Sequence, residues 1–93
     1  MREREIEAKL KRAVEDAGGL APKLVCPGFD GMPDRIVLLP GGQMCFVELK
    51  APGKTPRAIQ KRRIGQLRTL GFQVYIIDDE NQIPGVLEGT RHA

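Results

Sequence analysis

The sequence predicts an α/β domain with a mixed β-sheet flanked by helices, in the order α-β-β-β-α-β. Three observations predict it. Apolar residues recur at helical spacing near the start of the chain, two apolar runs flank a short glycine-containing loop, and a helical segment precedes a β-branched run. The last pattern is typical of a βαβ crossover, and the central strands are expected to carry whatever chemistry exists.

The first two elements lie before residue 27. Glu3–Ala17 carries apolar side chains at helical spacing and stops at Gly18-Gly19, a pair suited to a helix C-cap, so we expect an amphipathic helix. Leu20–Cys26 is short, apolar and closed by Pro27-Gly28, so we expect a strand despite Pro22 near its start. The following stretch, residues 29–33, is expected to be a loop.

An antiparallel hairpin is expected in the middle of the chain. Arg35–Leu39 and Met44–Lys50 are strand-like runs that flank the turn residues Pro40-Gly41-Gly42-Gln43. Antiparallel pairing returns the start of the first strand to the end of the second.

A helix and a strand complete the prediction. Thr55 supplies an N-cap and Pro56 a first helical residue, and the helix is expected to run to Leu70 with Gly71 as its stop. Phe72–Ile77 is then a strand. The tail after residue 81 is expected to form a turn and a marginal helix or coil.

Length and composition bound the class of protein. With 93 residues, 41% of them apolar, the chain predicts one domain over residues 1–93, too short for two cores and too apolar for disorder. A chain this short buries only about two-thirds of its surface, so we expect a homodimer more readily than a monomer.

Cysteine usage and hydropathy suggest a reduced, soluble protein. Cys26 and Cys45 lie in strand-like contexts without a zinc-ligand or disulfide pattern, so we expect buried thiols. The start of the chain has no apolar signal segment, and no apolar run reaches the length of a membrane span. We therefore expect a cytoplasmic protein without a membrane partner.

Charge is unevenly distributed along the chain. Fifteen Lys and Arg against twelve Asp and Glu give a net charge of only +3, but all charged residues between positions 50 and 68 are basic. A phosphate backbone binds such a segment through counterion release. A basic run is equally an ordinary way to solvate a helix face, so the pattern leaves both interpretations open.

Two acids and a lysine are candidates for a site. On an alternating strand Glu48 and Lys50 share a face, and this pair alone is most simply an ion pair at a strand end. Counting from the hairpin loop places Asp34 opposite Glu48 or its neighbour, although an Asx turn after proline would also explain Asp34. If the two carboxylates meet they demand a cation, and oxygen ligands suit Mg²⁺ or Mn²⁺.

Gln60 is a further candidate, on the second predicted helix. Gln60, Ile64 and Leu67 follow helical spacing, so the amide lies on the stripe that faces the sheet. A polar amide there needs a partner, which could be a site residue or the backbone at the helix end.

These residues resemble a known group of enzymes. Gly31-Met32-Pro33-Asp34 followed by Glu48-Leu49-Lys50 resembles the PD-(D/E)XK nuclease superfamily. With Gln60 on the next helix, the chain is similar more narrowly to the VRR-Nuc family, the virus-type replication-repair nucleases. The resemblance extends from the helix containing Glu7 to the strand ending at Ile77. It implies a restriction-endonuclease-like fold and a phage or bacterial origin.

The resemblance also implies a role for each matching residue. Asp34, Glu48 and the backbone carbonyl of Leu49 would hold Mg²⁺ or Mn²⁺. Lys50 would orient the attacking water and offset charge on the phosphate, and Gln60 would belong to the catalytic set. Phosphodiester hydrolysis independently requires a metal and a fixed cation near the nucleophile.

Glu7 matches the acidic position that the family carries on its first helix. The resemblance makes it a further candidate metal ligand. An ordinary surface pair between Glu7 and Lys11, one helical turn apart, is an equally good explanation.

The expected substrate is DNA. With one Tyr, three Phe and no Trp, the chain favours backbone and shape recognition over base stacking. The expected activity is that of a homodimeric endonuclease on branched DNA such as a four-way (Holliday) junction; the alternatives are a non-catalytic nucleic-acid-binding module and a protein-interaction domain with a basic helix. The basic residues expected to contact phosphates are Lys54, Arg57, Lys61, Arg62, Arg63 and Arg68.

Overall fold

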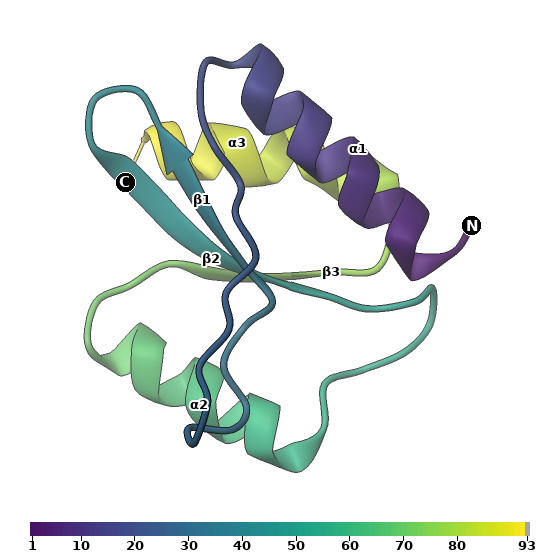
Figure 1. Cartoon of the computed structure of the whole chain (residues 1–93), viewed down its shortest axis with the longest axis vertical. Coiled ribbons are helices and arrows are strands. Elements are labelled where there is room, and N and C mark those ends of the chain that lie inside the picture. The colour runs from purple at the N-terminus through teal and green to yellow at the C-terminus, as the bar shows by residue number, and fades with distance from the viewer. Residues whose placement is uncertain (93) are drawn as a thin grey trace.

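A computed structural model describes residues 1–92. In chain order its elements are α1 (Glu3–Asp16), β1 (Arg35–Leu39), β2 (Gln43–Leu49), α2 (Ala58–Thr69), β3 (Val74–Ile77), the 3-10 turn η1 (Glu80–Gln82) and α3 (Ile83–Arg91). They form three layers, with α1 and α3 on one face of a three-stranded sheet and α2 on the other (Figure 1). The predicted α/β class with a mixed, helix-flanked sheet is confirmed. No helix within residues 1–92 is long and apolar enough to span a membrane.

β2 is the central strand. It pairs antiparallel with β1, Arg35 lying opposite Val47, as the hairpin predicts. On its other side it pairs in parallel with β3, Phe46 lying beside Val74, and α2 forms the crossover between the two parallel strands. The end of β2 therefore lies between the start of β1 and the end of β3.

The prediction of a regular strand over Leu20–Cys26 is wrong. Leu20 does exchange backbone hydrogen bonds with Leu38 of β1, and the N–H of Ile36 donates to the carbonyl of Pro22 at 3.1 Å. Proline has no N–H to donate in return, so the ladder breaks into isolated bridges. The segment still covers the outer edge of β1.

The second helix begins at Ala58, later than Thr55 and Pro56 predict. Arg57 has an extended backbone, with φ −68° and ψ 163°, and its N–H donates to Oε1 of Gln60 at 2.8 Å. A glutamine in the first turn thus satisfies the N-terminal backbone that Thr55 was expected to cap. The helix starts where this hydrogen bond can form.

The tail forms a turn and then a helix, α3, as one of the two predicted alternatives had it, and this helix is packed into the core. Ile83, Val86 and Thr90 are buried on its inner face, and Ile83 and Val86 join the core formed with α1 and the sheet. The Thr90 hydroxyl donates to the carbonyl of Val86 at 2.6 Å. Tertiary packing of this stripe stabilises a helix whose proline and glycines give it a weak intrinsic propensity.

The two faces of the sheet carry separate cores. Odd-numbered residues of β1 and β2, such as Val37 and Val47, pack against α1 and α3. Even-numbered residues of β2, represented by Phe46, pack against Ile64 and Leu67 of α2. Since side chains alternate along a strand, Glu48 belongs to the α2 face.

The two cysteines are free thiols with different surroundings. Cys45 is buried in β2, and this burial raises the pKa of its thiol. Cys26 is only half-buried, so the expectation of two buried thiols is corrected for that residue.

Gly31 allows the loop before β1 to approach α2 closely. Its φ is +89°, and a Cβ atom there would lie 2.6 Å from the carbonyl oxygen of Ile59. Both constraints exclude other residues without a shift of the backbone. The loop is thereby held against the first turn of α2, three residues before Asp34.

Gly31→Ala should destabilise the fold more than a matched substitution in the hairpin loop. Gly41 has the same φ of +89° but nothing within 4 Å of an added Cβ atom, so Gly41→Ala reports the backbone cost alone, roughly 1–2 kcal/mol. Gly31→Ala should cost roughly 1–3 kcal/mol more, because the clash adds to it. Urea unfolding of both variants measures the difference, and equal losses would contradict the close approach.

Candidate active site

Asp34 and Glu48 meet on the α2 face of the sheet. The β1–β2 register pairs Arg35 with Val47, so one step further Asp34 faces Glu48. The Asp34 carboxylate accepts a hydrogen bond at 2.9 Å from the N–H of Leu49. The structure thus brings together the two acids that sequence spacing placed opposite each other.

The two oxygens of Glu48 have different surroundings. Oε2 lies 3.1 Å from Nζ of Lys50 and accepts a hydrogen bond from Nε2 of Gln60 at 2.8 Å. Oε1 is buried and has no hydrogen-bond partner among residues 1–92. The whole residue is only 1% exposed. The protein therefore provides two partners for Oε2, while Oε1 remains available to a ligand.

This environment disfavours the ionised form of Glu48. Burial raises the pKa of its carboxyl, and the nearby charge of Asp34 raises it further, whereas Lys50 acts in the opposite direction. The raising effects outweigh the contribution of Lys50. A positive charge beside Oε1 would relieve both the desolvation of the carboxylate and its repulsion by Asp34.

The donor set fits a hard divalent cation. An orphaned buried carboxylate oxygen, a second carboxylate and the Leu49 carbonyl at the end of β2 are all oxygen donors, which Mg²⁺ and Mn²⁺ prefer. Within the described chain no cluster of three or more His, Cys, Asp or Glu side chains could hold a metal. A cation bound here would use two carboxylates and complete its coordination with main-chain or water oxygens.

Gln60 satisfies both interpretations that the sequence left open. Its Oε1 accepts from the N–H of Arg57 and its Nε2 donates to Glu48, so one buried amide caps α2 and holds the carboxylate. The two hydrogen bonds also fix which end of the amide faces Glu48, because a flipped amide would lose both. The position of the helix start and the orientation of Glu48 are therefore coupled.

Glu7 does not join this group. Its carboxylate lies 3.2 Å from Nε of Arg35, whose side chain also donates to the carbonyl of Ala21. Arg35 is an odd-numbered β1 residue, so this ion pair lies on the α1 face of the sheet, opposite the side of Glu48. The structure supports neither the metal-ligand interpretation of Glu7 nor its pairing with Lys11.

The six basic residues divide into two groups. Arg63 donates to the carbonyl of Asp30 at 2.9 Å and Arg68 donates to the carbonyl of Val74 at 2.7 Å, so both tie α2 to neighbouring segments. The others are exposed on α2 or on the loop before it, where they are accessible to phosphates: Lys54, Arg57, Lys61 and Arg62.

Sequence reasoning missed Asp78, which holds the loop beside the site. Its carboxylate accepts from the N–H of Gly53 at 3.2 Å, in the loop that carries Lys54. The N–H of Lys50 in turn donates to the carbonyl of Ile77 at 2.9 Å. An acid directly after a strand parallel to β2 was the available signal, because the ends of parallel strands lie at one edge of a sheet.

Comparisons with known proteins identify the family. No family model matches the chain. "Putative nuclease p44" of Acyrthosiphon pisum secondary endosymbiont phage 1 is 46% identical over 81 residues, which cover 87% of each protein. A solved structure described as "VRR_NUC domain" superposes with a TM-score of 0.86 at 32% identity, covering 92% of this chain and 94% of that one. The chain therefore belongs to the VRR-Nuc family, the virus-type replication-repair nucleases.

Proposed function

We propose that this chain is a divalent-metal-dependent endonuclease that hydrolyses phosphodiester bonds in DNA. The observation that carries the proposal is the buried Glu48 carboxylate, whose Oε2 is bonded by Lys50 and Gln60 while Oε1 has no partner within residues 1–92. A buried charged oxygen left unpaired is costly unless a ligand satisfies it. Membership of a nuclease family supports the same chemistry.

The metal would be held by Asp34, Glu48 and the carbonyl of Leu49. Bound Mg²⁺ or Mn²⁺ supplies Lewis-acid chemistry, which polarises a phosphodiester and lowers the pKa of a water molecule. With two carboxylates in the set, the site keeps the open positions that catalytic Mg²⁺ sites usually fill with water and substrate oxygens.

The remaining residues bind, orient and neutralise charge. Lys50 contacts Glu48 yet keeps 16% of its side chain exposed, so its ammonium can also orient the attacking water and offset charge that develops on the phosphate. Gln60 prevents the carboxylate from rotating away. Phosphates on either side of the cleaved bond would contact the exposed basic residues: Lys54, Arg57, Lys61 and Arg62.

The proposed substrate is branched DNA, such as a four-way junction, and the proposed active form is a homodimer. A chain of this length buries a small core, and a partner subunit adds to it. A two-fold symmetric dimer presents two identical sites to opposing strands, which is what paired cuts in a junction require. Recognition would rest mainly on the backbone and shape of the DNA.

Removing either charge at the centre of the site should abolish cleavage. In Mn²⁺ the parent should cut a labelled four-way junction, and Glu48→Gln or Lys50→Ala should each lower the single-turnover rate by about 100-fold or more, as expected when a charge-stabilising group is lost. Chelation of the metal should stop the parent. Rates are read from denaturing gels.

Glu88→Gln is a suitable control, because Glu88 is exposed on α3 and, in the described chain, pairs only with His92, the residue that follows this helix. It should cut at the parental rate. If Glu48→Gln cut as fast as the parent, the assignment of the site would be wrong. DNA binding without any cleavage in Mg²⁺ or Mn²⁺ would instead indicate a non-catalytic module.

Without metal, Glu48→Gln should stabilise the protein at neutral pH. The folded-state pKa of Glu48 lies above its usual value, so its contribution to stability is greatest at acidic pH, below the pKa of the unfolded chain, and is lost as pH rises through the folded-state pKa. In EDTA at pH 7.5, removing the charge should raise the melting temperature by about 4–8 °C, the shift expected for roughly 1 kcal/mol.

The same thermal scans provide two controls, one at acidic pH and one with added Mn²⁺. At acidic pH, where the raised pKa leaves Glu48 of the parent protonated and therefore neutral like the glutamine of the variant, the two melting temperatures should converge. Mn²⁺ should raise that of the parent and leave Glu48→Gln nearly unchanged, because a bound cation stabilises the carboxylate. A parent more stable than Glu48→Gln at neutral pH in EDTA would contradict the unfavourable burial of this charge.

A homodimer should cut opposing strands of one junction in a coupled manner. On a supercoiled plasmid with an extruded cruciform, the parent should yield linear product directly, with little nicked intermediate. Mixing the parent with excess Glu48→Gln should shift the product formed from linear to nicked plasmid, because each mixed dimer has one active site. Analytical ultracentrifugation checks the dimer independently, and a monomer that only nicks would refute this part of the proposal.

A further inference from the structure

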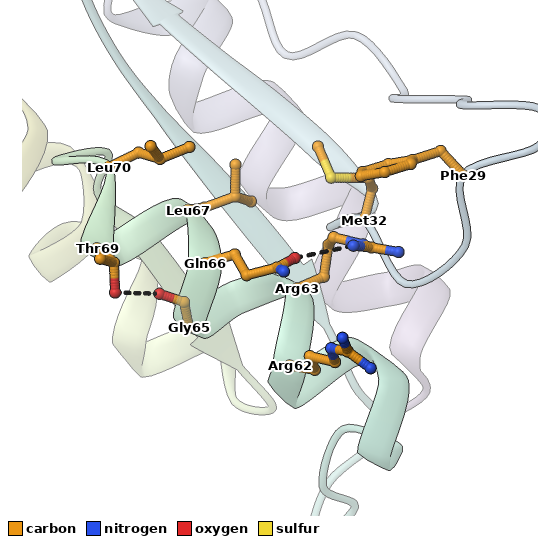
Figure 2. Close-up of a pocket in the computed structure, with 9 residues that line it drawn as sticks. All are labelled: Phe29, Met32, Arg62, Arg63, Gly65, Gln66, Leu67, Thr69 and Leu70. Atoms are coloured by element: carbon orange, nitrogen blue, oxygen red, sulfur yellow. Dashed lines mark hydrogen bonds between the residues drawn. The ribbon is translucent and has the colours of Figure 1, made fainter.

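A concave apolar groove lies between α2 and the loop that precedes β1. We call it the α2 groove. It has a volume of about 700 Å³, and its walls include Phe29 and Met32 from the loop, Leu67 from α2 and Leu70, which follows that helix (Figure 2). Its size lies within the range of ligand pockets, roughly 300–1,000 Å³.

Phe29 presents an aromatic surface in this groove. The residue is 51% exposed. The guanidinium carbon of Arg63 lies 3.8 Å from the ring centroid, and Nε of Arg63 donates to the carbonyl of Asp30. The ring is therefore held in place by a cation–π contact while much of its surface remains open.

The charge of the groove indicates which kind of ligand it fits. Arg62 and Arg63 line it, and none of its described lining residues is acidic. A symmetric contact between two copies would apply the same patch to itself and bring like charges together. An anionic ligand with a flat apolar part matches the groove better. A nucleotide has this combination, since its base offers a π-face and its phosphate a negative charge.

Both walls of the α2 groove belong to segments that also carry residues of the proposed site. On the loop side, Met32 lies two residues before Asp34. On the helix side, Arg63 follows Gln60 by three residues, which is about 4.5 Å along the helix axis. Gly31 packs against Ile59 and closes the two walls together. The loop and the helix that form the groove are therefore the same two segments that carry Asp34 and Gln60.

We propose that the α2 groove binds one unpaired base of the DNA, stacked on Phe29 with its phosphate near Arg62. The inference rests on the proposed function, because it takes the substrate to be DNA. It adds a specificity element: DNA that contains an unpaired base is preferred over continuous duplex. A single aromatic ring accommodates one base, in keeping with a chain that has few aromatic residues.

The test compares two labelled duplexes, one fully paired and one with a single unpaired nucleotide, by fluorescence anisotropy in EDTA. The parent should bind the second more tightly. Phe29→Leu, which keeps apolar volume but removes the π-face, should weaken that binding roughly tenfold and leave binding to the paired duplex within about twofold. Phe29→Tyr keeps the ring and should behave as the parent.

Val25→Ala is the control, since Val25 is an exposed apolar residue outside the groove. It should leave both affinities unchanged. Equal affinities of Phe29→Leu and the parent for the unpaired DNA would overturn the proposal, as would equal losses on both duplexes. A changed sedimentation coefficient in Phe29→Leu with unchanged DNA affinity would also overturn it, by indicating an interface between copies.

Failure of this inference is distinguishable from failure of the proposed function. Cleavage in Mn²⁺ is measured on the same preparations. A parent that cuts DNA while Phe29→Leu binds both duplexes normally refutes the groove alone. A parent that never cuts but loses its preference in Phe29→Leu refutes the nuclease and supports the groove.

Discussion

The carboxylate of Glu48 is the charge around which this domain is arranged. It is buried on the central strand, where an unpaired charge is costly. Lys50 and Gln60 both contact Oε2, whereas Oε1 has no hydrogen-bond partner within residues 1–92. Satisfying both oxygens internally would have given a more stable core and no room for a ligand. The different surroundings of the two Glu48 oxygens are expected where a protein gives up some stability to keep a ligand site.

Rigid elements hold each of these groups. Gln60 reaches Glu48 because α2 begins where the same amide caps its first turn, so a change in the helix start would move the carboxylate. Asp34 is fixed from two sides: the N–H of Leu24 donates to its carbonyl at 2.8 Å and the N–H of Leu49 to its carboxylate. Two backbone donors from different segments leave this acid little freedom.

Residue spacing in the sequence predicted where the main groups of the candidate site lie. Hairpin spacing placed Asp34 opposite Glu48, and helical spacing put Gln60 toward the sheet. It could not reveal that Pro22 breaks a ladder or that tertiary packing stabilises α3. Glu7 shows most clearly what the sequence pattern cannot predict, because its position on the first helix does not reveal which face of the sheet that helix covers. Only the partner Arg35, 28 residues away, decides between them.

α2 explains why charge alone left the function ambiguous. Its sheet-facing stripe is narrow, formed by Gln60, Ile64 and Leu67, and the rest of its surface is largely basic and exposed. Such a helix has little stability of its own, so Arg63 and Arg68 tie it to neighbouring backbone. Part of the basic run is thus structural. The helix whose exposed basic residues would contact DNA phosphates in the proposed function also carries Gln60, which is hydrogen-bonded to Glu48. A shift of this helix would therefore change both the basic surface and the candidate site.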